Sequence, residues 1–242
     1  MYFTSIADRD AAQMAVAAAC GPDVRTSAAS VADDGWAARS QADLRAVRVG
    51  RVIVAPPWDI PDPAALHNDD AVIVQIRPAL GFGSGHHPTT RLALRGLQQI
   101  TLDGHDVLDL GTGSGVLAVA AVKLGARAAI GIDRDTDALG SARESLTLNE
   151  VSDRVELRSG SLADITDTAR IIVANLTGAT LASQCHAIRA LCQPGGYLIL
   201  SGILASEAPA VSAAYEHAGP CVWRAAEDEW VGMVFRKKKD DA

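Results

Sequence analysis

Val107-Leu-Asp-Leu-Gly-Thr-Gly-Ser-Gly115 is the stretch of sequence around which the rest of the chain is organised. Its apolar residues and Asp109 predict a short buried strand, and its three glycines allow a tight turn in which no Cβ blocks the approach of another group. Residues 116–124 follow as a predicted apolar helix that ends at Gly125. A strand, a glycine-rich loop and a helix N-terminus in this order predict a ligand-binding unit.

An acidic residue follows this unit at a fixed distance. Residues 128–133 predict a second buried strand, which ends in Asp133. In nucleotide-binding α/β folds, an acid at this spacing meets the hydroxyl groups of a ribose. The pattern therefore predicts a cofactor that contains adenosine. The plainer alternative is a tight turn in which Asp133 only caps the next helix.

The order of the glycines favours one adenosine cofactor over the others. Counted from Gly111, the dinucleotide pattern G-x-G-x-x-G/A ends on Val116, and counted from Gly113 it begins two residues late. An acid before the loop would repel a pyrophosphate, whereas S-adenosylmethionine carries an amino group and a sulfonium. The triphosphate pattern G-x-x-x-x-G-K-[ST] does not occur. We therefore expect S-adenosylmethionine, bound by Asp109, Gly111, Gly113, Gly115 and Asp133.

Composition and charge limit the remaining classes of protein. The chain has 242 residues, of which 48% are hydrophobic, and this suits one large domain with a small appendage. A net charge of -7 argues against a broad nucleic-acid-binding face. No run approaches the roughly eighteen apolar residues that span a bilayer, and no signal peptide is apparent. The four cysteines form neither a C-x-x-C pair nor a zinc spacing with the histidines.

From these observations we expect a cytoplasmic protein without a metal site and without direct contact to nucleic acid or membrane. Its cysteines should be reduced and mostly buried.

Strands alternate with helices from residue 107 onward, which predicts a doubly wound, mostly parallel sheet covered on both faces. The last two predicted strands, 221–225 and 229–236, form an antiparallel hairpin. Ahead of this sheet, residues 47–55 and 71–77 alternate as two strands that pair with each other, and residues 10–20 predict a short helix. We expect a short N-terminal extension at 1–35, a linker with leading strands at 36–80, and the main domain at 81–242.

Gly81-Phe-Gly-Ser-Gly-His-His-Pro-Thr-Thr90 is the second distinctive stretch. Its glycines predict a flexible loop that folds over a ligand, and its last residues should cap a helix over residues 91–100. Neighbouring histidines point in different directions, so no shared metal ion is expected there. A plain surface turn is the alternative.

These stretches together resemble one family, the PrmA methyltransferases of bacterial large-subunit ribosomal protein 11. The resemblance rests on residues 55–58, 81–90 (F-G-[ST]-G-x-H-x-T-T), 109–117, 131–133, 173–176, 201–204 and 229–231. These segments run in the family's order from about residue 33 to the C-terminus. The resemblance implies a Rossmann-like class I methyltransferase fold, with a seven-stranded sheet whose last strand is antiparallel.

The resemblance also implies the residues of the site. S-adenosylmethionine contacts are expected at Thr90, Gly111, Asp133 and Asn175, and Phe82 and His87 should help to close over the cofactor or the acceptor.

The reaction itself places demands on the acceptor. A lysine amine, with a pKa near 10.4, must lose its proton before it attacks. The amide oxygen of Asn175 would accept a hydrogen bond from that amine and aim its lone pair. His86 or His87 would take the proton, or both would only hold the loop. Asn175 and His87 are therefore the candidate catalytic residues.

The leading hypothesis is an S-adenosylmethionine-dependent protein N-methyltransferase that acts on lysine or N-terminal amines of ribosomal protein 11 or another protein. Two departures from the family keep alternatives open. Family members carry an N-terminal recognition domain, whereas about thirty residues precede the matching region here. The segment Leu176-Thr177-Gly178 also lacks part of the family's continuation after the Asn. A small-molecule methyltransferase is the alternative, and a non-catalytic cofactor-binding module is a third hypothesis.

Overall fold

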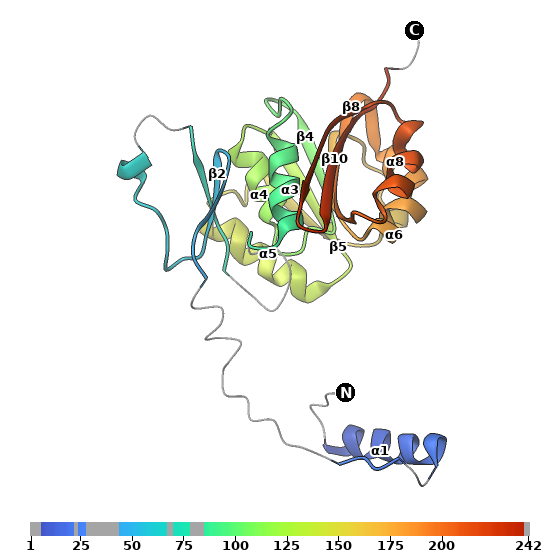
Figure 1. Cartoon of the computed structure of the whole chain (residues 1–242). Coiled ribbons are helices and arrows are strands. Elements are labelled where there is room, and N and C mark those ends of the chain that lie inside the picture. The colour runs from blue at the N-terminus through green and yellow to red at the C-terminus, as the bar shows by residue number, and fades with distance from the viewer. Residues whose placement is uncertain (1–5, 22–23, 28–43, 67–69, 78–84, 240–242) are drawn as a thin grey trace. The chain divides into compact units, whose positions relative to one another are not determined.

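The computed structural model describes residues 6–21, 24–27, 44–66, 70–77 and 85–239 (Figure 1). The chain divides into two compact units, residues 1–40 and 41–242. The first unit contains helix α1 (Ile6–Cys20), which begins four residues before the predicted helix and ends at Gly21, whose φ is 76°. A glycine ends a helix in this way because it tolerates a left-handed backbone. The expected boundaries at residues 35 and 80 stay a prediction.

The second unit is built on a seven-stranded sheet with the order β6-β5-β4-β7-β8-β10-β9. Strands β4 to β8 run parallel, and β10 is antiparallel to both β8 and β9. This arrangement confirms the predicted class I methyltransferase sheet and its closing hairpin. The strands are β4 (Asp106–Leu110), β5 (Ala128–Asp133), β6 (Val155–Ser159), β7 (Ala169–Asn175), β8 (Cys192–Leu204), β9 (Cys221–Glu227) and β10 (Trp230–Arg236).

Helices cover both faces of this sheet (Figure 1). Helices α3 (Pro88–Leu97), α4 (Val116–Lys123) and α5 (Thr136–Leu148) lie on one face, and α6 (Gly178–Ser183), α7 (Cys185–Leu191) and α8 (Ala208–Glu216) lie on the other. Successive strand residues alternate between the two cores: Val107 packs in the first and Leu108 in the second. Central strands are therefore apolar on both sides, as the sequence predicted. Short 3-10 turns occur at Pro63–Leu66 and Leu162–Asp164.

A separate three-stranded sheet packs beside α3 and α4. It contains β1 (Val47–Val49), β2 (Val52–Ala55) and β3 (Val72–Gln75). Strand β2 pairs in parallel with β3, which confirms that the leading strands pair. The prediction of one continuous strand over 47–55 was wrong. Gly50, at φ 61°, reverses the chain so that β1 folds back antiparallel onto β2.

Two side-chain amides attach this small sheet to helix ends. The backbone N–H of Arg51 donates to Gln98 Oε1 (2.8 Å), and Gln98 Nε2 donates to the carbonyl of Val49 (2.9 Å). In the same way Gln75 N donates to Asn149 Oδ1 (2.8 Å), and Asn149 Nδ2 donates back to the carbonyl of Gln75 (2.6 Å). Gln98 and Asn149 are the C-cap residues of α3 and α5. Each amide therefore supplies one donor and one acceptor, as a neighbouring strand would.

The cysteines differ in part from expectation. All four are free, but Cys20 and Cys221 are exposed and Cys185 is half-buried, so only Cys192 fits the predicted buried class. Within the described ranges, no three or more His, Cys, Asp or Glu residues gather in a way that suits a metal ion. The helices of those same ranges are too short or too polar to cross a membrane.

Candidate functional site

The order of the strands places the candidate site at the carboxyl edge of the main sheet. Strands β4 and β7 are neighbours, although β5 and β6 lie between them in the chain. The helices that follow β4 and β7 lie on opposite faces, so a crevice is expected outside the ends of these two strands. Leu110 lies opposite Ala174 and Ile132 in the ladder. Gly111, Asp133 and Asn175 therefore meet at one edge.

The glycine loop is fixed to the end of β5 by backbone hydrogen bonds. The N–H groups of Gly111 and Thr112 both donate to the carbonyl of Ile132, at 2.8 and 3.0 Å. Gly111, Gly113 and Gly115 have φ values of 73°, 53° and 78°, which explains why the loop requires glycine at these positions. The N-cap residue of α4 is Gly115, which has no side chain to cap the helix. The loop is thus preformed, with a helix N-terminus behind it.

Asp133 organises this loop as well as ending β5. Its Oδ2 accepts the N–H of Gly113 at 2.9 Å, and its Oδ1 accepts the N–H of Asp135 at 3.0 Å. Each carboxylate oxygen has a second lone pair, so the half-buried carboxylate keeps capacity for a ligand hydroxyl. The alternative in which Asp133 caps the next helix is wrong, because Asp135 is the N-cap of α5 and accepts the N–H of Asp137.

Asp109 lies behind the loop and is fully buried, with an exposed fraction of 0%. Its Oδ2 accepts the hydroxyl of Thr112 at 2.7 Å and the N–H of Ala118 at 3.1 Å. Its Oδ1 has no hydrogen-bond partner among the described residues. Burial, with a smaller contribution from the nearby charge of Asp133, raises the pKa of this carboxyl to about 6, although the hydrogen bonds from Thr112 and Ala118 lower it in part. The carboxyl therefore joins the loop to α4 from below, whereas its predicted contact with the cofactor stays a prediction.

The histidine and threonine run begins α3 differently from the sequence prediction. Pro88 is the first helical residue, and His87 is the N-cap, whose Nδ1 accepts the N–H of Thr89 at 3.3 Å. Thr90 is 1% exposed, and its Oγ1 is a buried polar atom with no partner among the described residues. An unpartnered buried hydroxyl is costly unless something else satisfies it. Phe82, the other predicted residue of this loop, lies outside the described residues.

Asn175 ends β7 next to Ser201 of β8. The buried hydroxyl of Ser201 donates to the carbonyl of Thr89 at 2.7 Å, and this ties the end of β8 to the first turn of α3. Gly202 follows with φ 84°, and a Cβ there would lie 2.2 Å from the carbonyl oxygen of Leu176. The motif over 201–204 therefore keeps Asn175, Thr89 and the chain after β7 close together.

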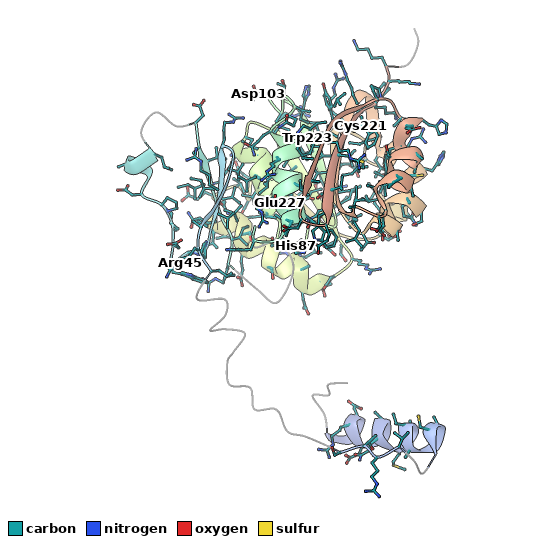
Figure 2. All side chains as sticks on the ribbon, in the orientation of Figure 1. Arg45, His87, Asp103, Cys221, Trp223 and Glu227 are labelled. Carbon is teal, nitrogen blue, oxygen red and sulfur yellow. The ribbon has the colours of Figure 1, made fainter. Side chains whose placement is uncertain are left out.

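Three residues at this edge were not predicted as site residues. Glu227 of β9 accepts Arg91 Nε at 2.5 Å, and the ring of Trp230 on β10 lies edge-on to the ring of His87, with centroids 5.1 Å apart. Figure 2 labels His87 and Glu227, which come from opposite ends of the domain sequence. Arg91 and Glu227 are 136 residues apart, and the local sequence around each of them does not predict their contact.

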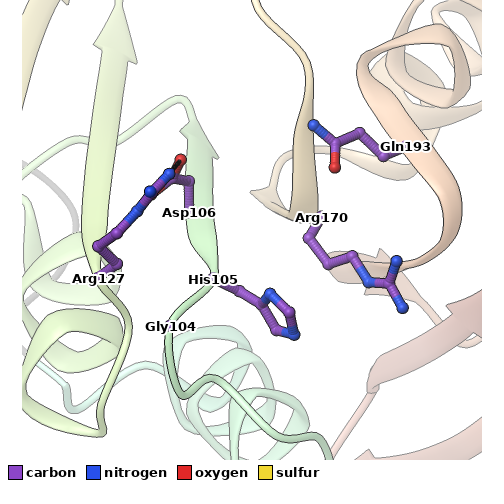
Figure 3. A pocket seen from close by; sticks show the side chains of 6 residues that line it. All are labelled: Gly104, His105, Asp106, Arg127, Arg170 and Gln193. Carbon is purple, nitrogen blue, oxygen red and sulfur yellow. Dashed lines mark hydrogen bonds and ion pairs between the residues drawn. The ribbon is translucent and has the colours of Figure 1, made fainter.

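A cavity of about 250 Å³ lies at the other edge of the sheet. Asp106 begins β4, and Arg127 binds it through Nε at 2.8 Å, while Arg170 and Gln193 come from the other side of the cavity (Figure 3). It is lined by Gly104, His105, Asp106, Arg127, Arg170 and Gln193. None of these is a predicted site residue. The cavity lies at the start of β4, whereas the glycine loop follows the end of that strand, so the two are separate.

Comparison with known proteins agrees with the geometry of the site. Residues 2–238 match the family described as ribosomal protein L11 methyltransferase (PrmA). The match therefore begins well ahead of residue 33, where the recognised motifs start. The chain is 38% identical over 208 residues to the ribosomal protein L11 methyltransferase of Serratia proteamaculans (strain 568), covering 85% of this chain and 69% of that protein. The Salmonella heidelberg (strain SL476) protein of the same name is 40% identical with the same coverage.

Solved structures agree as well. The ribosomal protein L11 methylase of Lactobacillus delbrueckii subsp. bulgaricus superposes with a TM-score of 0.73 at 28% identity, covering 81% of this chain and all of that one. An RNA methyltransferase from Salinibacter ruber in complex with S-adenosyl-L-homocysteine superposes with a TM-score of 0.52 at 17% identity, covering 62% of this chain and 93% of that one. The second likeness concerns the fold alone. With its sheet, its glycine loop and a family match over nearly its whole length, the chain belongs to the ribosomal protein L11 methyltransferase (PrmA) family.

Proposed function

We propose that this chain transfers methyl groups from S-adenosylmethionine to amines of ribosomal protein L11. The observation that carries the proposal is the family match over residues 2–238, together with relatives named ribosomal protein L11 methyltransferase. The chain is an S-adenosylmethionine-dependent protein methyltransferase. A protein acceptor is thereby favoured over the small-molecule and non-catalytic alternatives.

The residues at the carboxyl edge fit the cofactor. The glycines of the loop all have positive φ, which gives the loop the tight turn of a cofactor-binding loop, and Asp133 retains lone pairs for ribose hydroxyls. The buried Thr90 hydroxyl, which has no partner among residues 85–239 or the other described ranges, supplies a further polar group at the start of α3. These features support our assignment of Thr90, Gly111, Gly113, Gly115, Asp133 and Asn175 as cofactor-binding residues.

Methyl transfer requires the protein mainly to align the acceptor amine with the methyl group. S-adenosylmethionine supplies a methyl group that its sulfonium has already activated. The protein must hold the acceptor amine in its neutral form and in line with that group. We assign the alignment to the Asn175 amide oxygen, which accepts a hydrogen bond from the amine but is no base.

For His87 the contacts favour the second of its two predicted roles. Nδ1 accepts the N–H of Thr89 at 3.3 Å and lies 2.8 Å from the hydroxyl oxygen of Thr89, so this nitrogen is engaged in the cap. We therefore assign His87 to holding the start of α3 rather than to taking the proton of the acceptor.

The test uses methyl-labelled S-adenosylmethionine with free ribosomal protein L11, with large ribosomal subunits, and with a small-molecule extract in parallel. We expect label on ribosomal protein L11. Asn175→Ala should lower kcat about hundredfold, since it removes a group positioned in the transition state. The exposed amide of Gln99 provides the matched control, Gln99→Ala, which should leave kcat unchanged. Label found only in the small-molecule extract would overturn the proposal.

We also propose a cytoplasmic location, because the acceptor named for the relatives is a ribosomal protein. The free cysteines are in keeping with a reducing compartment.

A further inference from the structure

The first turn of α3 is held by three consecutive strands at the end of the sheet. Strand β8 holds it through the Ser201 hydroxyl, which donates to the carbonyl of Thr89. Strand β10 holds it through Trp230, whose ring packs on His87. Strand β9 holds it through Glu227, which binds Arg91. Thr90, whose hydroxyl has no partner among the described residues, therefore lies on a turn that is positioned by strands β8, β9 and β10.

Glu227 is the charged centre of these contacts. Its Oε1 accepts Arg91 Nε at 2.5 Å, and its Oε2 lies 3.2 Å from Nη2 of Arg95. The side chains of Glu227 and Arg91 are only 21% and 20% exposed. An ion pair this sheltered is screened less than a surface pair and holds a more definite geometry. The carboxylate thus holds the Arg91 guanidinium by a hydrogen bond, whereas its contact with the more exposed Arg95, one turn further along α3, is an ion pair only.

Arg91 carries this restraint one step further along the chain. While its Nε faces Glu227, its Nη1 donates to the carbonyl oxygen of His86. The planar guanidinium makes both contacts with donors fixed in one fork, which a single ammonium group does not reproduce. Glu227 therefore restrains the backbone at His86, the residue before the N-cap of α3. Turning Arg91 away would remove the contact at His86, while the contacts of Ser201 with Thr89 and of Trp230 with His87 would stay.

We propose that Glu227 is a positioning residue for the cofactor site, acting through Arg91 to fix the segment from His86 to Thr90. This inference rests on the proposed function, because it assigns Thr90 to S-adenosylmethionine. The competing view is an ion pair that only stabilises the fold. The two views predict different results. Breaking a purely structural ion pair lowers the melting temperature alone, whereas replacing a positioning residue also weakens the binding of S-adenosylmethionine to the folded protein.

The experiment compares the full chain with Glu227→Gln and Arg91→Lys. Binding of S-adenosylmethionine is measured by isothermal titration calorimetry, and thermal unfolding by circular dichroism. We expect Kd to rise about fivefold or more in both variants, since each breaks a charge-assisted contact that orders the turn. In kinetic assays KM for S-adenosylmethionine should rise with little change in kcat. Glu227→Asp, which keeps the charge, should recover part of the affinity.

Asp167→Asn is the matched control. Asp167 accepts Arg158 Nη1 at 2.5 Å in another three-residue ion-pair cluster, remote from α3. The Kd of the Asp167→Asn variant for S-adenosylmethionine should stay within about twofold of that of the unaltered chain. An unchanged Kd in Glu227→Gln, or an equal loss in Asp167→Asn, would overturn the inference while leaving the proposed function intact. Failure of the unaltered chain to bind S-adenosylmethionine would overturn the proposed function itself, and the inference with it.

Discussion

Asp109 carries a carboxyl group that the protein encloses completely, beneath the loop that we assign to the cofactor. Two donors reach Oδ2, and within the part of the chain that the structure describes none reaches Oδ1. An unpaired carboxylate oxygen in such a place is costly as an anion and much less so when it carries a proton. The raised pKa, about 6 against an ordinary 3.8, expresses this cost.

The cost of ionising the buried Asp109 carboxyl predicts an unusual dependence of stability on pH. Between about pH 4 and 6 the folded chain keeps a proton on Asp109 that the unfolded chain has released, so raising the pH through this window destabilises the fold. Compared with Asp109→Asn, the unaltered chain should lose on the order of 2 to 3 kcal/mol of unfolding free energy from pH 4 to pH 7. Urea titrations of both chains at intervals of half a pH unit measure this difference, and parallel curves would contradict it.

At the level of elements, the link between β8 and α3 depends on one buried hydroxyl. Ser201→Ala removes the side-chain donor of the Thr89 carbonyl in a place that water does not reach, and this should cost about 0.5 to 1.5 kcal/mol. Ser183→Ala, which removes an exposed hydroxyl bonded to the carbonyl of Thr180 at 3.2 Å, should cost less than about 0.5 kcal/mol. Chemical denaturation compares the two. Equal losses would mean that Ser201 contributes nothing beyond a surface serine.

Local sequence was enough to predict those elements whose shape depends on neighbouring residues. The glycine loop after β4 and the hairpin of β9 and β10 are examples, since glycine spacing and alternation each specify a backbone conformation. The single strand predicted over 47–55 failed because Gly50 turns the chain between the alternating residues 47–49 and the continuous apolar run 52–55. The cap of α3 was also misassigned: His87 occupies the N-cap position, ahead of the threonines that usually take that role.

The candidate site was predictable only in part, for the same reason. Asp133 and Asn175 end strands whose apolar runs are visible in the sequence, so their meeting at one edge follows from a parallel sheet. The contacts of Glu227 with Arg91 and of Trp230 with His87 join segments that lie more than 130 residues apart. Only the order of the strands brings these segments together, and a single sequence does not state that order.

For the whole molecule, the division into two units makes a further test possible. Residues 41–242 contain both cores and every described residue of the candidate site. A chain that begins at residue 41 should therefore unfold cooperatively and bind S-adenosylmethionine with a Kd within about twofold of the full chain. Circular dichroism and calorimetry provide the measurement. A shortened chain that neither folds nor binds would mean that the first unit is part of the core.

The small sheet suggests how the molecule opens in solution. The amide protons of Arg51 and Gln75 are held by the side chains of Gln98 and Asn149, which stand at the ends of α3 and α5. Hydrogen exchange at these two nitrogens therefore records the moment at which the small sheet leaves its helices, without any unfolding of the large sheet. The rate of deuterium uptake at these two amides therefore measures how often the small sheet separates from α3 and α5.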